Sequence, residues 1–103
     1  MSPENSIDLI QNDDAATLAE LFSAFSDPSR LRIISSLVDR ELNVGTIAEL
    51  VGLTESATSH HLRGLRQMNL VRARKEGRQV YYSLKDEHVK RLYQIGLDHV
   101  LHD

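Results

Sequence analysis

The stretch VGTIAELVGLTESATSHHLRGLRQ, residues 44–67, decides the fold because it predicts two helices joined by a tight turn. The first helix covers about 44–51, and its inward-facing residues are expected to be Ile47, Ala48 and Leu50. Gly52 supplies the turn, and Thr54 is a suitable N-cap for the second helix, residues 55–68. A glycine turn followed at once by a capped helix is typical of a helix-turn-helix.

The second helix of this pair has two different faces. Its inner face repeats at helical spacing and consists of Ala57, Thr58, Leu62, Leu65 and Met68. Its opposite face is polar and consists of Ser56, Ser59, His60, Arg63 and Gln67. Such a surface suits contact with base edges in the major groove of DNA. We therefore predict that DNA is bound by Ser56, Ser59, His60 and Arg63.

The chain before this unit predicts two more helices. Residues 13–25 carry an apolar stripe at three- and four-residue spacing, made of Ala15, Leu18, Phe22 and Phe25. Asp27 as N-cap and Pro28 as first helical residue then begin a helix that ends near Asp39. Its apolar residues are Leu31, Ile34, Leu37 and Val38. We expect residues 1–12 to be a disordered acidic N-terminus and residues 13–103 to form one domain.

After the helix-turn-helix the period changes from helical to alternating. Residues 71–84 predict a β-hairpin with its turn at Lys75-Glu76-Gly77-Arg78, and the alternating apolar residues are Val71, Ala73, Val80, Tyr82 and Leu84. A basic hairpin directly after a DNA-reading helix is typical of a winged helix-turn-helix, a mainly α fold with a small β-hairpin (α+β). We predict that Arg74, Lys75 and Arg78 reach phosphates or a minor groove. The alternative is an ordinary hairpin with solvated charges.

The charge distribution supports a DNA partner although the net charge is −3. Residues 1–27 hold six carboxylates and no Lys or Arg, whereas residues 54–80 hold six cations and two carboxylates. A local basic stretch is the electrostatic footprint that matters for DNA. The 103 residues contain no cysteine and no apolar run approaching 18 residues, so disulfides, thiolate metal sites and a membrane span are not expected. Because the first residues also do not resemble a signal peptide, we expect a cytoplasmic protein.

The segment DEHVKRLYQIGLDHVLHD, residues 86–103, predicts a helix that carries metal ligands. Asp86 is a good N-cap, and beside it stands His88; His99 and His102 face the same way near the far end. His88 and His99 are separated by roughly 16 Å along the axis, too far for one ion with bonds of about 2.0–2.2 Å.

A second copy of this helix, antiparallel across a two-fold axis, would complete the set. Asp86 and His88 of one chain would then meet His99 and His102 of the other, which gives two identical sites in a homodimer. Three imidazoles and one carboxylate form a tetrahedral set that suits Zn²⁺. The alternative is that these are solvated histidines at a fraying chain end.

No enzyme motif competes with these features. The chain has no glycine-rich phosphate loop, no HExxH and no nucleophile–base signature, so we predict that it is not an enzyme. Two rival functions stay open: a metal-independent winged-helix regulator of the same fold, and a small zinc-dependent hydrolase or metal-storage dimer without DNA binding.

The chain from about residue 14 onward resembles the ArsR/SmtB family of metal-sensing repressors. The resemblance rests on SDPSRLRIISSL, ELNVGTIAELVGLTESATSHHLRGL, the GRQVYYSL strand and the D-x-H-x10-H-x2-H pattern at residues 86–102. It implies a homodimer whose terminal helices form the interface, binding of an imperfect inverted repeat in operator DNA, and repression relieved by metal. Ser56, Ser59 and His60 match positions where the family contacts DNA.

The resemblance also bears on the metal. Asp86, His88, His99 and His102 match the family's zinc-responsive site on the C-terminal helix. The other common site uses a cysteine where this chain has Asn43, so a response to thiophilic ions is not expected. Some nickel and cobalt sensors recruit ligands from either terminus, whereas this sequence has no histidine before residue 60 and ends at Asp103. We therefore expect Zn(II), with Co(II) as a surrogate, in preference to Ni(II).

Overall fold

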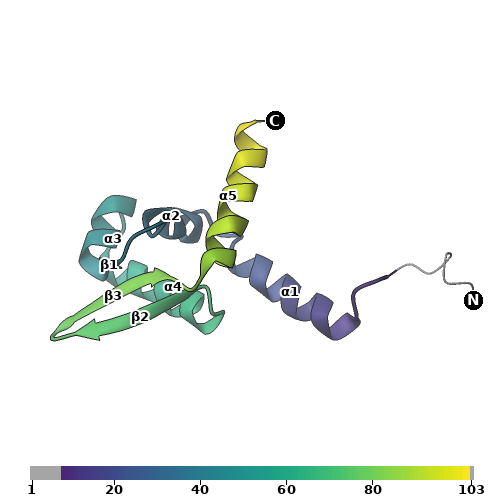
Figure 1. The fold of residues 1–103 in the computed structure, drawn as a ribbon. Helices are drawn as coiled ribbons and strands as arrows, with labels where there is room; N and C mark the ends of the chain where they lie inside the picture. The colour runs from purple at the N-terminus through teal and green to yellow at the C-terminus, as the bar shows by residue number, and fades with distance from the viewer. Residues whose placement is uncertain (1–7, 103) are drawn as a thin grey trace, which may run out of the picture.

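A computed structural model of the chain describes residues 8–102, within which there are five helices and a small three-stranded antiparallel sheet whose hairpin projects at one side of the helices (Figure 1). The elements are α1 (Asn12–Ala24), α2 (Pro28–Ser36), β1 (Leu42–Asn43), α3 (Val44–Val51), α4 (Glu55–Gln67), β2 (Val71–Glu76), β3 (Gln79–Leu84) and α5 (Glu87–Leu101). This order confirms the predicted winged helix-turn-helix. Of the predicted disordered N-terminus, residues 1–7 lie outside the described residues, and residues 8–11 precede α1 without regular structure.

Side-chain caps begin the helices where the sequence predicted them. The carboxylate of Asp27 accepts hydrogen bonds from the backbone N–H groups of Ser29 and Arg30, with Pro28 as the first residue of α2. Thr54 Oγ1 accepts one from the N–H of Ala57 at the start of α4. These caps satisfy N–H groups that have no partner inside the helix. Helix α2 ends at Ser36, earlier than predicted, and Asp39 has a positive φ of 60° in the turn that follows.

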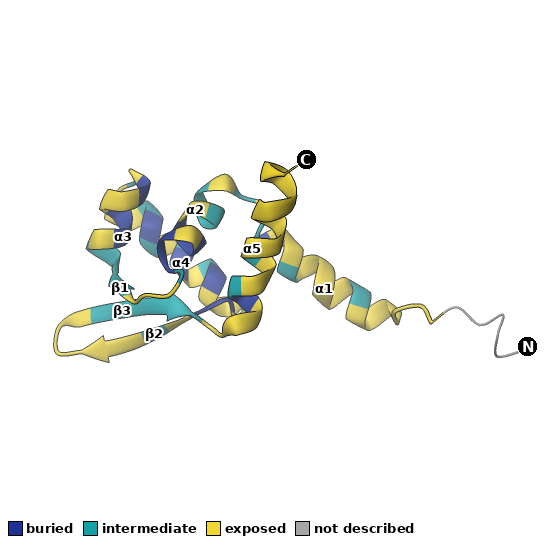
Figure 2. Cartoon of the chain, turned by 45° about the horizontal axis from the view of Figure 1, so that its top comes forward, coloured by how far each residue is buried: buried dark blue, intermediate teal, exposed yellow. Residues whose placement is uncertain are grey.

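The hydrophobic core lies between α2, α3 and α4, where the dark blue of buried residues concentrates in Figure 2. Its largest fully buried side chains are Ile33, Ile34, Leu37, Ile47, Leu62, Leu65, Leu70 and Val71. The sequence prediction was wrong for α3, since Leu50 is 49% exposed and Val51 is buried in its place. The buried face also includes Ala48; at about 100° per residue Val51 lies between Ile47 and Ala48, whereas Leu50 lies on the far side of Ile47 from Ala48.

The sheet has one strand that the sequence did not predict. Strand β1 pairs with β3, and β3 pairs with β2, so the order is β1-β3-β2. Leu42 of β1 lies opposite Tyr82 of β3, and Ala73 of β2 lies on the other side of Tyr82. The turn between β2 and β3 is shorter than predicted and consists of Gly77 and Arg78, where Gly77 takes a φ of 61°. The hairpin of β2 and β3, called the wing below, is therefore joined through β1 directly to α3.

Helices α1 and α5 extend away from the rest of the protomer (Figure 1). Helix α5 is anchored by Val89, its buried residue, and by an ion pair of 2.6 Å between Lys90 Nζ and Asp39 Oδ1. Beyond this first turn α5 is largely exposed, as is α1 along most of its length (Figure 2). Among the described residues, no helix combines the length and the apolar character needed to cross a membrane.

Candidate nucleic-acid interface and metal ligands

Helix α4 is placed by its contacts with α2 and α3. Gly52 adopts the left-handed conformation (φ 71°) that ends α3, and the N–H of Leu53 donates to the carbonyl of Ala48. Thr58 is fully buried, and its hydroxyl donates to the carbonyl of Thr54 at 2.8 Å. This hydrogen bond explains how a threonine takes a core position in α4, because its one polar group is satisfied inside the helix.

The predicted reading face of α4 is open to solvent. Ser56, His60 and Arg63 are exposed and Ser59 is half-buried, so all four side chains lie on or at the edge of one surface. The opposite side is held by Arg30 of α2, whose Nε donates to Nδ1 of His61 at 3.3 Å. The Arg30 guanidinium also lies where a Cβ at Gly64 would stand, 2.5 Å from its Nη2. A larger residue at 64 would therefore require the end of the Arg30 side chain to shift.

The three predicted wing cations do not share one environment. Lys75 and Arg78 are exposed at and beside the turn. The guanidinium of Arg74 instead forms ion pairs with Glu41, at 2.7 Å, and Glu76, at 2.9 Å. The hydrogen bonds from Arg74 hold the pKa of Glu41 below its ordinary value, and Glu41 in turn raises the pKa of Arg74.

Asp86 and His88 come together at the start of α5. Asp86 is the N-cap, and its Oδ1 accepts a hydrogen bond of 3.2 Å from the N–H of Val89. Its other oxygen, Oδ2, lies 3.7 Å from Nδ1 of His88. Extended backbone angles at Asp86 (φ −164°, ψ −177°) allow this approach, which two residues inside a helix could not make. The carboxylate can therefore cap the helix with one oxygen and face the imidazole with the other.

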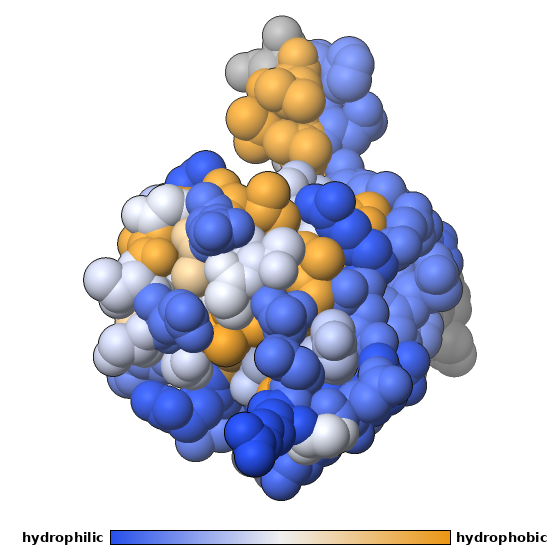
Figure 3. All heavy atoms as spheres, turned by 90° about the vertical axis from the view of Figure 1, so that its left-hand side faces the viewer, coloured by the Kyte–Doolittle hydropathy of each residue, from blue (hydrophilic) through white to orange (hydrophobic). Residues whose placement is uncertain are grey.

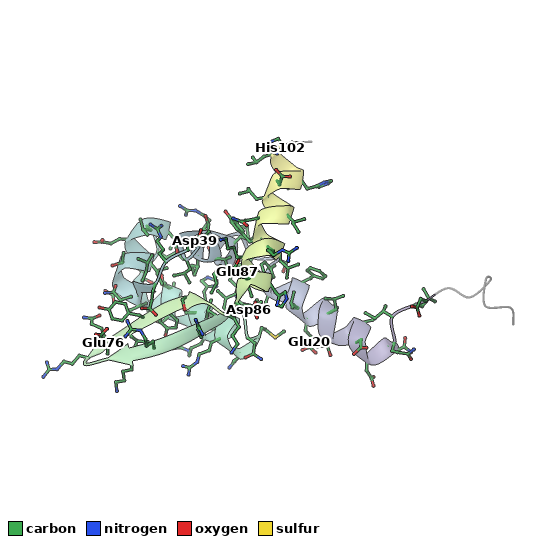
Figure 4. The ribbon with its side chains drawn as sticks, in the orientation of Figure 1. Glu20, Asp39, Glu76, Asp86, Glu87 and His102 are labelled. Atoms are coloured by element: carbon green, nitrogen blue, oxygen red, sulfur yellow. The ribbon has the colours of Figure 1, made fainter. Side chains whose placement is uncertain are left out.

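The other two predicted ligands lie at the far end of the same helix. Asp86 stands at the base of α5 and His102 at its opposite end (Figure 4). His99 and His102 are both exposed. Within residues 8–102 of a single protomer, no three His, Cys, Asp or Glu side chains come together in a way that could hold a metal ion. One chain thus offers two pairs of potential metal donors, one pair at each end of α5.

An unfilled apolar surface runs between α1 and α5. Phe22 is 51% exposed, Leu92 38% and Val100 70%. A groove of about 560 Å³ separates the two helices and is lined chiefly by Phe22, Phe25, Leu31, Leu92, Tyr93, Gly96, Leu97 and Val100. Figure 3 shows apolar side chains gathered on one side of a segment that projects from the protomer. In the described part of the chain, a Cβ added at Gly96 would meet no neighbouring atom within 4 Å.

Comparison with known proteins identifies the family. Residues 27–73 match the family model described as bacterial regulatory protein, arsR family. A transcriptional repressor SmtB homolog from Synechocystis sp. is 51% identical over 88 residues, which cover 85% of this chain and 67% of that protein. The chain belongs to the ArsR family. This family consists of regulatory proteins, so the ArsR-family chain is a transcriptional regulator and not an enzyme, as the sequence predicted.

Two further similarities bear on the ArsR-family assignment. A cadmium resistance transcriptional regulatory protein CadC homolog from Staphylococcus aureus is 41% identical over 83 residues, covering 80% of this chain and 69% of that protein. The solution structure of a homodimeric winged helix-turn-helix DNA-binding domain from Mycobacterium bovis, a possible ArsR-family regulator, matches with a TM-score of 0.79. It is 29% identical, and the match covers 91% of this chain and 90% of that one.

Three polar partners in this ArsR-family chain were not found from the sequence. Glu41 contacts Arg74 from 33 residues away, and no local pattern indicates such a contact. Arg30 reaches α4 in the same non-local way. Asp98 contacts His102 and could have been found, because residues four apart on a helix face each other.

Proposed function

We propose that this ArsR-family chain is a metal-responsive repressor that binds operator DNA as a homodimer in the cytoplasm and is released when Zn(II) binds. The ion would be held at two inter-subunit sites by Asp86 and His88 with His99 and His102 of the partner subunit. The approach of Asp86 Oδ2 to His88 Nδ1 at 3.7 Å carries the metal part of the proposal.

The DNA part rests on the open polar face of α4. Ser56, Ser59, His60 and Arg63 present hydroxyl, imidazole and guanidinium groups that suit base edges and phosphates of a major groove. Lys75 and Arg78 at the wing would contact neighbouring phosphates. A symmetric dimer has two copies of α4 and of the wing. With the two α4 helices about 34 Å apart, it fits an imperfect inverted repeat.

The dimer part rests on the exposed apolar side chains of α1 and α5. Monomeric proteins rarely leave contiguous apolar surface of this kind uncovered. A second copy that covers the groove with its own α1 and α5 makes an isologous contact, in which the same patch serves both subunits. Gly96 fits this arrangement, because among residues 8–102 of its own protomer no neighbouring atom would meet a Cβ there, which leaves room for close approach of a partner helix.

The donor set fits zinc. Adjacent donors around a four-coordinate zinc ion, with bonds of about 2.1 Å, lie roughly 3.4 Å apart, close to the Asp86–His88 separation. Imidazole and carboxylate donors also suit Co(II) and Ni(II), and we place Zn(II) first because the set of four fills a tetrahedron. A zinc ion in such a closed set would supply a cross-link between subunits and no open position for catalysis.

The chain connects these ligands closely to the DNA-binding parts. Asp86 follows the last residue of β3 by two positions, and Lys90 joins the same turn of α5 to the loop after α2. A movement of Asp86 and His88 would thus move the wing as well, because few rotatable bonds separate Asp86 from the end of β3. By linkage, operator DNA must weaken metal binding by the same factor by which metal weakens DNA binding.

A titration tests this proposal. Co(II) added to the apoprotein should give the visible absorption of tetrahedral nitrogen and oxygen coordination and saturate at one ion per chain. Zn(II) added to the protein–operator complex should release the DNA over the same range. DNA binding that persists at saturating zinc would instead support the metal-independent regulator, and octahedral coordination would exclude the proposed site.

A further inference from the structure

Arg74 lies at the centre of a network that crosses the sheet. It stands in the middle of β2, opposite Tyr81 of β3, and its guanidinium carbon lies 5.0 Å from the centroid of the Tyr81 ring. Its Nε lies 3.1 and 3.2 Å from the two carboxylate oxygens of Glu41, and its Nη2 lies 2.7 Å from Oε1 of the same group. Nη1 donates to Glu76 at 2.9 Å. Three nitrogens of one side chain are thus engaged by two carboxylates.

This arrangement separates Arg74 from the other wing cations. Within residues 8–102, neither Lys75 nor Arg78 forms an ion pair. A phosphate approaching Arg74 would meet the negative charge of Glu41 and Glu76 and would have to compete with them for the guanidinium. A phosphate approaching Arg78 at the turn meets a side chain that is open to solvent. Charge alone therefore does not make Arg74 a DNA contact.

Glu41 ties the network to the helix-turn-helix. It directly precedes β1, whose two residues pair with Tyr82 and Tyr81 of β3. The second of these residues, Asn43, is also the N-cap of α3, where its Oδ1 accepts a hydrogen bond of 2.9 Å from Thr46 N–H. A contact from β2 to Glu41 therefore spans all three strands and ends at the chain that enters α3.

We propose that Arg74 is a positioning residue, which fixes the wing relative to the helix-turn-helix through its two-pronged contact with Glu41 and does not bind a phosphate. This inference rests on the proposed DNA-binding function. It replaces the sequence-based expectation that Arg74 belongs with Lys75 and Arg78. The planar guanidinium is essential to the role, because an ammonium group carries the same charge but cannot match a carboxylate with parallel N–H bonds.

The test compares operator affinity over a range of salt concentrations for Arg74→Lys, Arg74→Gln, Glu41→Gln and Arg78→Gln. The first three variants should each weaken binding by at least about twofold, the lower end of coupling within one ion-pair network. Their salt dependence should equal that of the unmodified protein. Arg78→Gln should reduce the slope of log K against log salt by about 0.9, the value for one lost phosphate contact. The double variant Glu41→Gln/Arg74→Gln should be no weaker than either single variant.

Opposite results would overturn the inference. If Arg74 binds a phosphate, Arg74→Lys keeps the original affinity, Arg74→Gln lowers the salt slope as Arg78→Gln does, and Glu41→Gln strengthens binding by freeing the cation. Unchanged affinity in all the Arg74 and Glu41 variants would overturn it as well.

A second measurement needs no DNA and separates this inference from the proposed function. In the free protein, amide order parameters at the wing turn, residues 75–78, should fall in Arg74→Lys and stay unchanged in Arg78→Gln. Unchanged order parameters in Arg74→Lys would contradict the positioning role even if the protein binds its operator. Failure of the unmodified protein to bind duplex DNA would contradict the proposed function alone.

Discussion

Nδ1 of His102 lies 2.9 Å from the carbonyl oxygen of Asp98 and 2.9 Å from its carboxylate oxygen Oδ1. Both atoms are acceptors, so this ring nitrogen carries the proton and donates. In the proposed site, the other ring nitrogen, Nε2, would keep its lone pair for the metal ion. A carboxylate that orients a ligand histidine in this way fixes the tautomer and makes the imidazole a better donor.

Asp98→Ala should therefore weaken zinc binding, by about tenfold, at the lower end of the effect of losing such a partner. Asp98→Asn is the matched control, because its amide oxygen can still accept from Nδ1. Its zinc affinity should lie between those of Asp98→Ala and the unmodified protein. Competition with a chelating dye measures these affinities. Equal zinc affinity in Asp98→Ala and the unmodified protein would exclude the orienting role.

His99→Ala should abolish the zinc response and leave the DNA-binding surfaces intact. The substitution removes one of four proposed donors and lies near the C-terminal end of α5, the end that projects away from α4 in Figure 1. Fluorescence anisotropy of a labelled operator, with and without zinc, measures both properties. A variant that still releases DNA on addition of zinc would show that regulation uses other residues.

Val100→Glu should convert the proposed dimer to a monomer. The side chain is 70% exposed in the protomer and lines the α1–α5 groove, so a partner subunit that covers the groove would bury the new charge without a counter-ion. Gln94→Glu adds the same charge to the same helix outside that groove and should stay dimeric. Sedimentation velocity separates the two results, and a dimeric Val100→Glu protein would place the interface elsewhere.

Leu62→Ala should destabilise the fold by about 2–5 kcal/mol, because the side chain is fully buried and its removal leaves a cavity. Leu50→Ala on the exposed side of α3 is the control and should change the free energy of unfolding by about 0.5 kcal/mol or less. Urea unfolding at fixed protein concentration compares the two. A large effect at Leu50 would mean that an interface covers this residue.

Asp27 should make stability depend on pH below its ordinary pKa of 3.8. The N–H groups of Arg30 and Ser29 hydrogen-bond its carboxylate and lower the pKa in the folded protein. Because the pKa of Asp27 is lower in the folded protein than in the unfolded chain, the ionised carboxylate stabilises the fold at pH values above the unfolded pKa. This stability is lost as the pH falls through the folded pKa. Asp27→Asn should keep the cap and show a flatter decline in acid, measured by thermal unfolding between pH 3 and pH 6 (roughly one unit below to two above the ordinary pKa). A parallel decline in both proteins would assign the acid sensitivity to other carboxylates.

The sequence predicted those features whose causes are local. Asp27, Thr54 and Gly52 act within four residues of themselves, so their side-chain type and position are sufficient to begin or end a helix. The inner face of α4 was predicted correctly because several residues repeat the same spacing. Helix α3, with only 8 residues, gives a weaker periodic pattern, and Leu50 was placed on the wrong face.

Features that depend on distant residues were not predictable in the same way. Strand β1 has two residues, too few for an alternating pattern, and exists because β3 offers it a pairing edge. Glu41, the partner of Arg74, stands 33 residues away in the chain. The sequence therefore showed the positive charge of Arg74 but not the carboxylate that pairs with it. Asp86 and His88 lie close together because a capping residue is released from helical geometry, and this contact is local. That they bind a metal ion stays a prediction.

Asn43 caps a helix at a position where the family resemblance places a metal ligand in some relatives. The family resemblance places a thiolate ligand at this position in relatives that detect softer ions, whereas here the amide caps α3 with its hydrogen bond to Thr46. Cysteine is a poor cap, so a lineage that gained the thiolate would lose roughly 1 kcal/mol of stability unless another residue compensated. A thiolate at this position would thus be coupled to the stability of the helix-turn-helix.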